Sequence, residues 1–300
     1  MLRLLDLIDK TPGGVVGTLI STEGHTYKKA GEKALFEPGN PFPIFGNLGS
    51  LCVDQELLRV ATEVVADEKP RILGIDTRDP SDVHFGYGVY CGGTMEVLIE
   101  PLTESNRGIY RRLHAFVREN RTVYLVHDLV TGNLALSETS PTPEHERMFV
   151  EKVEKRPDVF LFGATPLAER MAAELVDMAF FVHIVDWRPA YLEKFSRRDD
   201  VVAHENECVF DAESFVVILS HSFDRDREVL ERALDTGCRY VGLMSSTTRR
   251  NAIYDALRGD GVAEEALVRI HSPIGKNLGG RSDAEIAVAI LAELIEERYR

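Results

Sequence analysis

The segment "GYGVYCGG" (86–93) combines a thiol with very little side-chain bulk, because it contains four glycines beside Cys91. A thiolate is a soft metal ligand and can take part in sulfur exchange. The glycines, Gly88, Gly92 and Gly93 among them, would let a bulky anionic group approach exposed backbone N–H groups. Cys91 is therefore the candidate metal ligand. The structural alternative is a small buried cysteine packed under a glycine turn.

Two further residues could serve the same ligand. Cys52 follows "GNLGSL" and lies at the start of a predicted helix over 53–68. A helix N-terminus lowers the pKa of a thiol, although the carboxylate of Asp54 opposes this effect. Lys28 lies close to Gly31 and could contact an anionic ligand, or it could be an ordinary solvated lysine. Whether Cys52 and Cys91 share one cleft is not decided by the sequence.

The second half of the chain has the plan of a dinucleotide-binding unit: a strand, a glycine turn, a helix, a second strand and an acid. Gly163 occupies the turn and Asp186 ends the second strand. Thr165 stands where the fingerprint requires a second glycine, and Pro166 lacks an N–H group. These two residues disfavour NAD(P) as a ligand, while the fold is still expected to be Rossmann-like. The alternative role for Asp186 is to accept hydrogen bonds from loop amides.

Two histidines lie in loops of this half. His221 follows the predicted strand "SFVVILS", at the strand end where such folds place ligands. His271 lies in "HSPIGKNLGG". Each histidine could contact a phosphate, or it could hold a loop in place. No HxH, HExxH or CxxC spacing occurs, so the pattern predicts no dedicated zinc or iron site.

The hydrophobic pattern predicts the elements that position these residues. The first half mixes strands and helices and forms an N-terminal α/β domain over 1–150, ending in the turn-rich segment 137–147. The expected strands of this half are 14–22, 71–76, 94–102 and 121–129, and its expected helices are 53–68 and 104–119. From 156 to 300, strands alternate with helices, which predicts a Rossmann-like domain whose parallel sheet is covered on both faces. The expected strands there are 158–163, 180–186, 214–220 and 239–244, and its expected helices are 164–179, 226–237, 247–261 and 282–300.

Composition excludes several classes of function. The 300 residues carry a formal net charge of −14, so nucleic-acid binding is not expected. No apolar run is long enough to span a bilayer, and the start of the chain reads as an amphipathic helix and not as a signal peptide. The four cysteines form no CxxC pair and are expected as reduced thiols in the cytoplasm, with Cys208 and Cys238 packed in cores.

With both halves considered, the chain resembles the xanthine dehydrogenase accessory factor (XdhC/CoxI) family along nearly its whole length. Four stretches carry the resemblance: 21–36, 46–57, 74–102 and 240–295. The resemblance implies an accessory role in the maturation of molybdenum hydroxylases. It implies that the chain holds the molybdenum cofactor (molybdopterin) while a terminal sulfur is installed. The cofactor would then pass to an apo-hydroxylase of the xanthine dehydrogenase or CO dehydrogenase type, with a cysteine desulfurase as a candidate sulfur source.

The chain departs from the family pattern at several positions: Tyr27, Lys28, Leu51, Thr165, Ser245 and Thr247. The changes in the second half remove bare backbone or charge where a phosphate would sit. They therefore put its nucleotide-like site in doubt more than the cysteine site of the first half.

Three functions remain open at this stage. The leading hypothesis is a carrier and insertion factor for the molybdenum cofactor, with Cys91, alone or with Cys52, as the soft ligand. The alternative is an NAD(P)-dependent oxidoreductase supported by Gly163 and Asp186. The third is a docking module that holds no cofactor. A homodimer is compatible with an acidic soluble protein of this class, although no particular residue argues for it.

Overall fold

The computed structural model of this chain describes two compact units, Met1–Lys155 and Arg156–Arg300. It describes every residue except 26–27, 50, 77, 79–92, 143–146 and 207. No helix in the described part of the chain is long and apolar enough to cross a membrane. Each unit has cores of its own.

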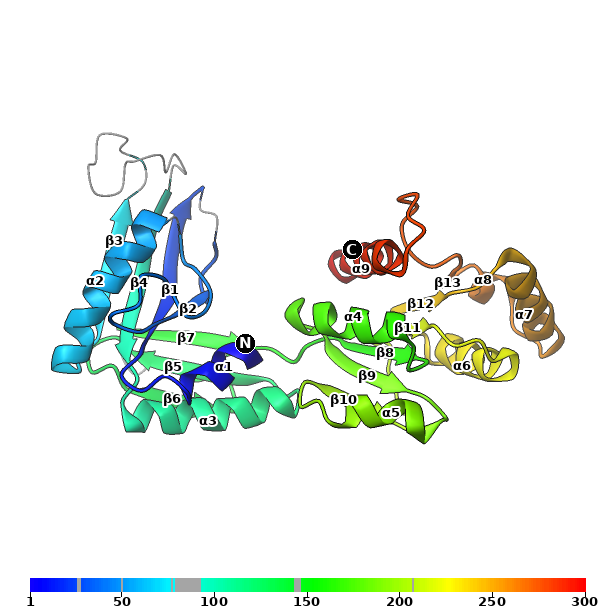
Figure 1. Cartoon of the computed structure of the whole chain (residues 1–300), viewed down its shortest axis with the longest axis horizontal. Helices are drawn as coiled ribbons and strands as arrows, with labels where there is room; N and C mark the ends of the chain where they lie inside the picture. The colour runs from blue at the N-terminus through cyan, green and yellow to red at the C-terminus, as the bar shows by residue number, and fades with distance from the viewer. Residues whose placement is uncertain (26–27, 50, 77, 79–92, 143–146, 207) are drawn as a thin grey trace. The chain divides into compact units, whose positions relative to one another are not determined.

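The first unit contains a four-stranded antiparallel sheet with strand order β2-β1-β4-β3, covered by one long helix (Figure 1). The bounds are β1 (Val15–Gly24), β2 (Lys33–Phe36), β3 (Arg71–Asp76), β4 (Gly93–Pro101) and α2 (Leu51–Asp67). The predicted apolar stripe of α2 is buried against the sheet, as expected for a helix with one apolar face. The short strand β2 was not predicted, since four residues give too little pattern to detect.

A three-stranded antiparallel sheet with order β6-β5-β7 completes this unit, together with two helices. The bounds are β5 (Val123–Asp128), β6 (Leu134–Ser137), β7 (Met148–Val153), α1 (Leu2–Ile8) and α3 (Glu104–Arg118). Apolar side chains of α1 and α3 share one core with strand residues. The sequence after the turn-rich segment, residues 148–157, allowed a short strand or a linker; the structure has the strand β7 there, paired with β5.

Arg107, in α3, binds the end of α1 and the residue after β4 through its side chain. Its guanidinium is largely buried and donates to the carbonyl oxygens of Ile8, Thr11 and Leu102. The carbonyl of Ile8 lies at the end of α1, where helices leave such groups without intrahelical donors. A buried cation is tolerated here because several polar groups surround it.

A buried ionic network links the two sheets of the first unit. The Nζ atom of Lys33 lies 2.6 Å from Glu151 Oε2 and donates to Thr18. The Nδ1 atom of His127 lies 2.7 Å from Glu100 Oε2. Burial opposes a charge on His127, but the two carboxylates outweigh it and raise the pKa of the imidazole. With His127 protonated, two cations face two carboxylates, so the network is balanced in charge.

The second unit is built on a six-stranded parallel sheet with order β10-β9-β8-β11-β12-β13. Counted within the unit, this is the order 3-2-1-4-5-6 of a doubly wound nucleotide-binding fold. The direction of winding reverses between β8 and β11. The bounds are β8 (Asp158–Phe162), β9 (Phe181–Val185), β10 (Val201–His204), β11 (Phe215–Ile218), β12 (Tyr240–Leu243) and β13 (Ile270–His271).

Helices cover both faces of this sheet, as the alternating pattern predicts. One face carries α4 (Pro166–Asp177), α5 (Pro189–Ser196) and α9 (Asp283–Tyr299), and Figure 1 shows α4 beside α9. The other face carries α6 (Phe223–Thr236), α7 (Thr247–Gly259) and α8 (Glu264–Leu267). The last helix begins with a side-chain cap, because Ser282 forms a capping box with Glu285. The fold class therefore agrees with the prediction from sequence.

Candidate functional site

Gly163 directly follows β8, at the point where the sheet reverses its winding. Its φ of +108° lies in a region that residues other than glycine rarely adopt. A Cβ atom at this position would lie 2.9 Å from the backbone nitrogen of Ser220, directly after β11. The glycine is therefore required for the close approach of two neighbouring strand ends.

The backbone N–H groups of this turn already have partners within the protein. The N–H of Gly163 donates to the carbonyl of Val185, and that of Thr165 donates back to Gly163. The N–H of Ala164 donates to Asp186 Oδ2 at 2.8 Å. A pyrophosphate in a nucleotide-binding turn needs such groups to be free.

The first turn of α4 is similarly occupied. Thr165 is the N-cap, and its hydroxyl accepts a hydrogen bond from the N–H of Ala168. Pro166 at the first helical position has no N–H to offer. The residues that would cradle a pyrophosphate thus do not fit a dinucleotide bound in the usual way.

Asp186 has its carboxylate fully engaged by neighbouring residues. Beyond Ala164, it accepts from the backbone N–H of Arg188 at 3.0 Å and from the guanidinium of Arg188 at 2.9 and 2.8 Å. Burial opposes its ionisation, but these hydrogen bonds outweigh burial and lower its pKa. The geometry matches the alternative role considered from sequence, in which the acid accepts hydrogen bonds from loop amides.

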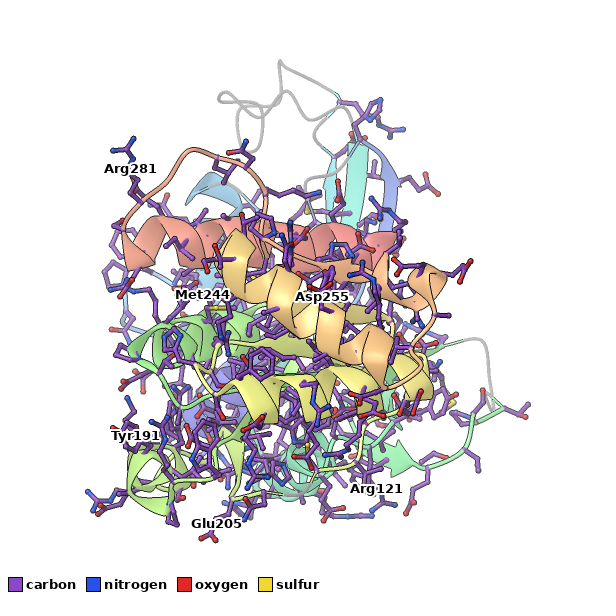
Figure 2. The ribbon with its side chains drawn as sticks, turned by 90° about the vertical axis from the view of Figure 1, so that its right-hand side faces the viewer. Arg121, Tyr191, Glu205, Met244, Asp255 and Arg281 are labelled. Atoms are coloured by element: carbon purple, nitrogen blue, oxygen red, sulfur yellow. The ribbon has the colours of Figure 1, made fainter. Side chains whose placement is uncertain are left out.

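A cavity of about 500 Å³ opens at the carboxyl ends of β8, β9, β11 and β12. Figure 2 labels two residues of its wall, Tyr191 from α5 and Met244 after β12. Among the other residues of the wall are Thr165, Leu167, Trp187, Arg188, Leu219, His221, Ser222 and Asp283. Doubly wound sheets place ligands at this edge. In the described part of the chain, no group of three or more His, Cys, Asp and Glu residues could hold a metal ion.

Aromatic side chains and an arginine form one wall of the cavity. The guanidinium carbon of Arg188 lies 3.9 Å from the ring centre of Tyr191 and 4.7 Å from that of Trp187. The carboxylate of Asp186 holds this guanidinium in place by accepting two hydrogen bonds from it. Sequence reasoning missed all three wall residues. The proline after Arg188 was an available signal, because proline favours the first position of a helix.

His221 lies at the cavity, as its place after β11 predicts. Behind it, the hydroxyl of Ser220 donates to the buried carboxylate of Asp226, which also pairs with Arg249. Burial is the largest influence on Asp226 and raises its pKa, against the hydrogen bonds from Ser220 and Arg249. The second predicted histidine, His271, does not line this cavity.

His271 instead belongs to a buried cluster around Glu293. Its Nδ1 atom lies 3.0 Å from Glu293 Oε1, and its ring centre lies 4.6 Å from that of Tyr240. The other oxygen of Glu293 accepts from the Tyr240 hydroxyl and the Gly275 N–H, both at 2.7 Å. Burial would raise the pKa of Glu293, but these contacts outweigh burial and lower it to about 2. His271 therefore helps to hold α9 against the sheet.

The predicted thiol site of the first unit is described only at its rim. Cys91, Gly88 and Gly92 lie outside the described residues, as does the side chain of Cys52 at the start of α2. Gly93 begins β4 and pairs with Gly24 at the end of β1.

The neighbouring strand β3 ends at the same edge of the sheet. Its last residue, Asp76, pairs with Thr94 of β4. β3 therefore ends, and β4 begins, at the same end of the four-stranded sheet; these are the strands before and after the segment that carries Cys91.

Lys28 lies near the start of α2. The side chain of Asp54, in the first turn of α2, is buried, and this burial raises its pKa. The N–H groups of Leu48 and Gly49 and the charge of Lys28 act in the opposite direction. Lys28 is thus close enough to the first turn of α2 for its charge to act on the carboxylate of Asp54.

The remaining cysteines, Cys208 and Cys238, are free and buried. Burial is the main cause that raises the pKa of each thiol to about 11. They are protonated core residues with little reactivity, as the sequence predicts.

Comparison with known proteins places this arrangement in a family. The profile of the XdhC and CoxI family matches residues 8–76, and that of the XdhC Rossmann domain matches residues 159–294. The chain belongs to the XdhC and CoxI family. The second profile covers the whole parallel sheet and the cavity, so the Rossmann-like unit is the XdhC Rossmann domain.

Known XdhC-like relatives are distant. A probable xanthine dehydrogenase subunit of Bacillus subtilis is 24% identical over 98% of this chain and 96% of its own length. The "Uncharacterized protein YqeB" of Escherichia coli is 24% identical over 93% of this chain, which spans 42% of that protein. A crystal structure from Bacillus halodurans, described as a xanthine dehydrogenase, shares the fold with a TM-score of 0.78 and 24% identity. It covers 100% of this chain and 96% of its own.

Proposed function

We propose that this chain is an accessory protein for the maturation of a molybdenum hydroxylase of the xanthine dehydrogenase type. The observation that carries the proposal is the match of both units, in order, to XdhC profiles. A relative described as a probable xanthine dehydrogenase subunit matches along 98% of the chain. The proposed task is to bind the molybdenum cofactor, to assist its sulfuration and to pass it to the apo-enzyme.

The residues proposed to hold the cofactor lie in the first unit. Cys91 would supply the soft sulfur ligand, and its flanking glycines would leave room for a pterin and its phosphate. When bound, the group would supply the molybdenum centre of the target enzyme. Gly93 at the described rim and Lys28 near the start of α2 support this placement, because they bring bare backbone and a cation to the same unit.

The proposed role is that of a carrier and not of a turnover enzyme. A carrier needs a site that binds and releases, together with partners that deliver and accept. The proposed acceptor is an apo-hydroxylase of the xanthine dehydrogenase or CO dehydrogenase type, and the proposed sulfur source is a cysteine desulfurase. A homodimer would present two such sites to its partners.

Cofactor content tests the proposal. The full chain is produced in a host that makes molybdenum cofactor, and the pterin is quantified after oxidation to its fluorescent form. We expect bound pterin in the native protein and its loss in Cys91→Ser. The matched control is Cys208→Ser, which alters a buried thiol of the second unit and should retain the pterin. Equal pterin content in native protein and Cys91→Ser would overturn the site assignment.

Transfer to a partner tests the accessory role itself. Native protein carrying cofactor is mixed with an apo-hydroxylase of the xanthine dehydrogenase type, and hydroxylase activity is followed with time. Activation by the native protein, and not by Cys91→Ser, is the expected result. Binding to the apo-enzyme without activation would instead favour a docking module.

A further inference from the structure

The cavity of the Rossmann-like unit has the size and position of a small-molecule site. Its volume of about 500 Å³ lies within the range of roughly 300–1,000 Å³ that ligand pockets usually have. It opens at the carboxyl ends of β8 and β11, the neighbouring strands between which the winding reverses, where doubly wound sheets place their ligands. All of its lining residues belong to the second unit.

The polar groups of this cavity argue against recognition of a dinucleotide. The N–H groups of Gly163, Ala164 and Thr165 already donate within the protein. The carboxylate that would contact a ribose, Asp186, accepts four hydrogen bonds from Ala164 and Arg188. The groups that usually contact a pyrophosphate and a ribose are therefore already hydrogen-bonded to other residues of the protein.

The wall formed by Trp187, Arg188 and Tyr191 supplies a different kind of recognition. Two aromatic rings lie on one guanidinium, which Asp186 fixes through two hydrogen bonds. Aromatic rings and a planar guanidinium both stack on flat heterocycles.

The rest of the cavity suits the edges of such a ring. Leu219 and Met244 add apolar surface, while His221 and Ser222 can reach polar atoms at a ring edge.

We propose that this cavity binds a single planar heteroaromatic ring system, of the size of one nucleotide base or one pterin, and does not recognise a dinucleotide. Purine mononucleotides and pterins share this chemistry, and the test separates the two sources. The ring stacks on the wall of Trp187, Arg188 and Tyr191. The internal hydrogen bonds of Asp186 remain in place when the ligand is bound.

The chain offers a direct probe of this cavity, because Trp187 is its single tryptophan. Emission of Trp187 in the full chain is titrated with AMP, GMP, pterin-6-carboxylate and NAD⁺, and calorimetry repeats each titration without optical interference. We expect saturable binding of a purine mononucleotide, of the pterin or of both, and the stronger ligand names the source. NAD⁺ should bind no more tightly than AMP. Absence of saturation for all three ring ligands up to about 1 mM, or binding of NAD⁺ about tenfold tighter than AMP, would overturn the proposal.

Substitution of the wall completes the test. Tyr191→Ala removes a stacking ring that is 50% exposed, so folding should be little affected, and Trp187 remains as the probe. Loss of one stacking partner should weaken binding about tenfold or more. The matched control is Tyr299→Ala, because Tyr299 also lies under an arginine, with 5.5 Å between the guanidinium carbon of Arg298 and the ring centre, but it is outside the cavity. Equal affinity of Tyr191→Ala and the native protein would place the ligand elsewhere and overturn the assignment.

Discussion

Glu293 is the most consequential charge in the second unit, because one carboxylate holds three separate elements. It accepts hydrogen bonds from the Tyr240 hydroxyl and the Gly275 N–H, and it pairs with His271. The side chain of Glu293 is 10% exposed, whereas that of His271 is 30% exposed. Glu293→Gln keeps the shape of the side chain and removes its charge.

The pKa of Glu293 sets the size of the effect. The pKa falls from an ordinary 4.5 to about 2 in the folded protein. A difference of that size corresponds to roughly 3 kcal/mol, and screening through the partly exposed His271 reduces it to about 2 kcal/mol. Since the folded pKa is the lower one, this stabilisation is complete above pH 4.5 and disappears as the pH falls towards 2.

Urea unfolding measures this prediction, with Trp187 emission as the signal. The only tryptophan lies in the second unit, so its emission reports the unfolding of that unit. At pH 7, Glu293→Gln should lower the free energy of unfolding by about 2 kcal/mol. The difference between native protein and variant should narrow by about 1 kcal/mol as the pH falls from 6 to 4.

A matched surface variant separates this cluster from a general effect of charge. Glu296 lies one turn further along α9, and its carboxylate pairs with Lys276 and Arg300 at the surface. Glu296→Gln should unfold at the same urea concentration as the native protein. If Glu293→Gln also unfolds there, or if its deficit does not change between pH 6 and pH 4, the reasoning about Glu293 is wrong.

Three further predictions concern the frameworks of the two units. Arg107→Met removes the donors to three buried carbonyls, Ile8 among them, and should destabilise the first unit by about 2–4 kcal/mol in thermal unfolding. The pKa of His127 is raised, so its stabilisation should be present at pH 6 and be lost as the pH rises through the folded value. Hydrogen-exchange protection factors of β5 and β7, corrected for the intrinsic rise of exchange with pH, should fall at higher pH in the native protein and not in His127→Gln. Gly163→Ala should lower the free energy of unfolding, measured in urea, by about 2–5 kcal/mol. The alanine would have an unfavourable φ, and its Cβ would press on the backbone at Ser220. Unchanged stability would show that the strand ends move apart freely.

The sequence predicts the Rossmann-like unit well because its local signals agree with each other. Its central strands are continuous apolar runs, its long helices carry apolar stripes, and Ser282 and Gly237 mark helix ends in the usual manner. The elements that escaped prediction are short: β10, α5, α8 and β13. The edge strands β10 and β13, of four and two residues, are too short to show a period.

The first unit was harder to predict because its sheets form between distant segments. The turn-rich segment 137–147 has the composition of a domain boundary, yet β7 follows it and pairs with β5. Strand pairing of this kind depends on the complementary faces of two segments and not on the pattern within one.

The candidate site shows the same limit. The ends of the predicted strands placed His221 correctly at the cavity and Gly163 in the turn just before its first lining residue, since a position after a strand is a local signal. The internal use of Asp186 by Arg188 was not visible, because it depends on how one side chain folds back. For His271 the sequence left open a contact with phosphate or a role in holding a loop; its actual partner, Glu293, was not visible because the contact joins residues far apart in the sequence.

The ion pair of Lys33 and Glu151 also bears on when, during synthesis of the chain, the first unit can complete its fold. Lys33 leaves the ribosome more than a hundred residues before Glu151, and its ammonium is buried in the finished unit. Its carboxylate partner belongs to β7, the last strand of the unit and the one just before the Rossmann-like unit begins. Until that strand has been synthesised, the nascent sheet carries a lysine without the carboxylate that pairs with it in the finished unit. The first unit therefore closes late in its own synthesis, and a fragment that stops before Met148 should be recognised by chaperones as unfinished.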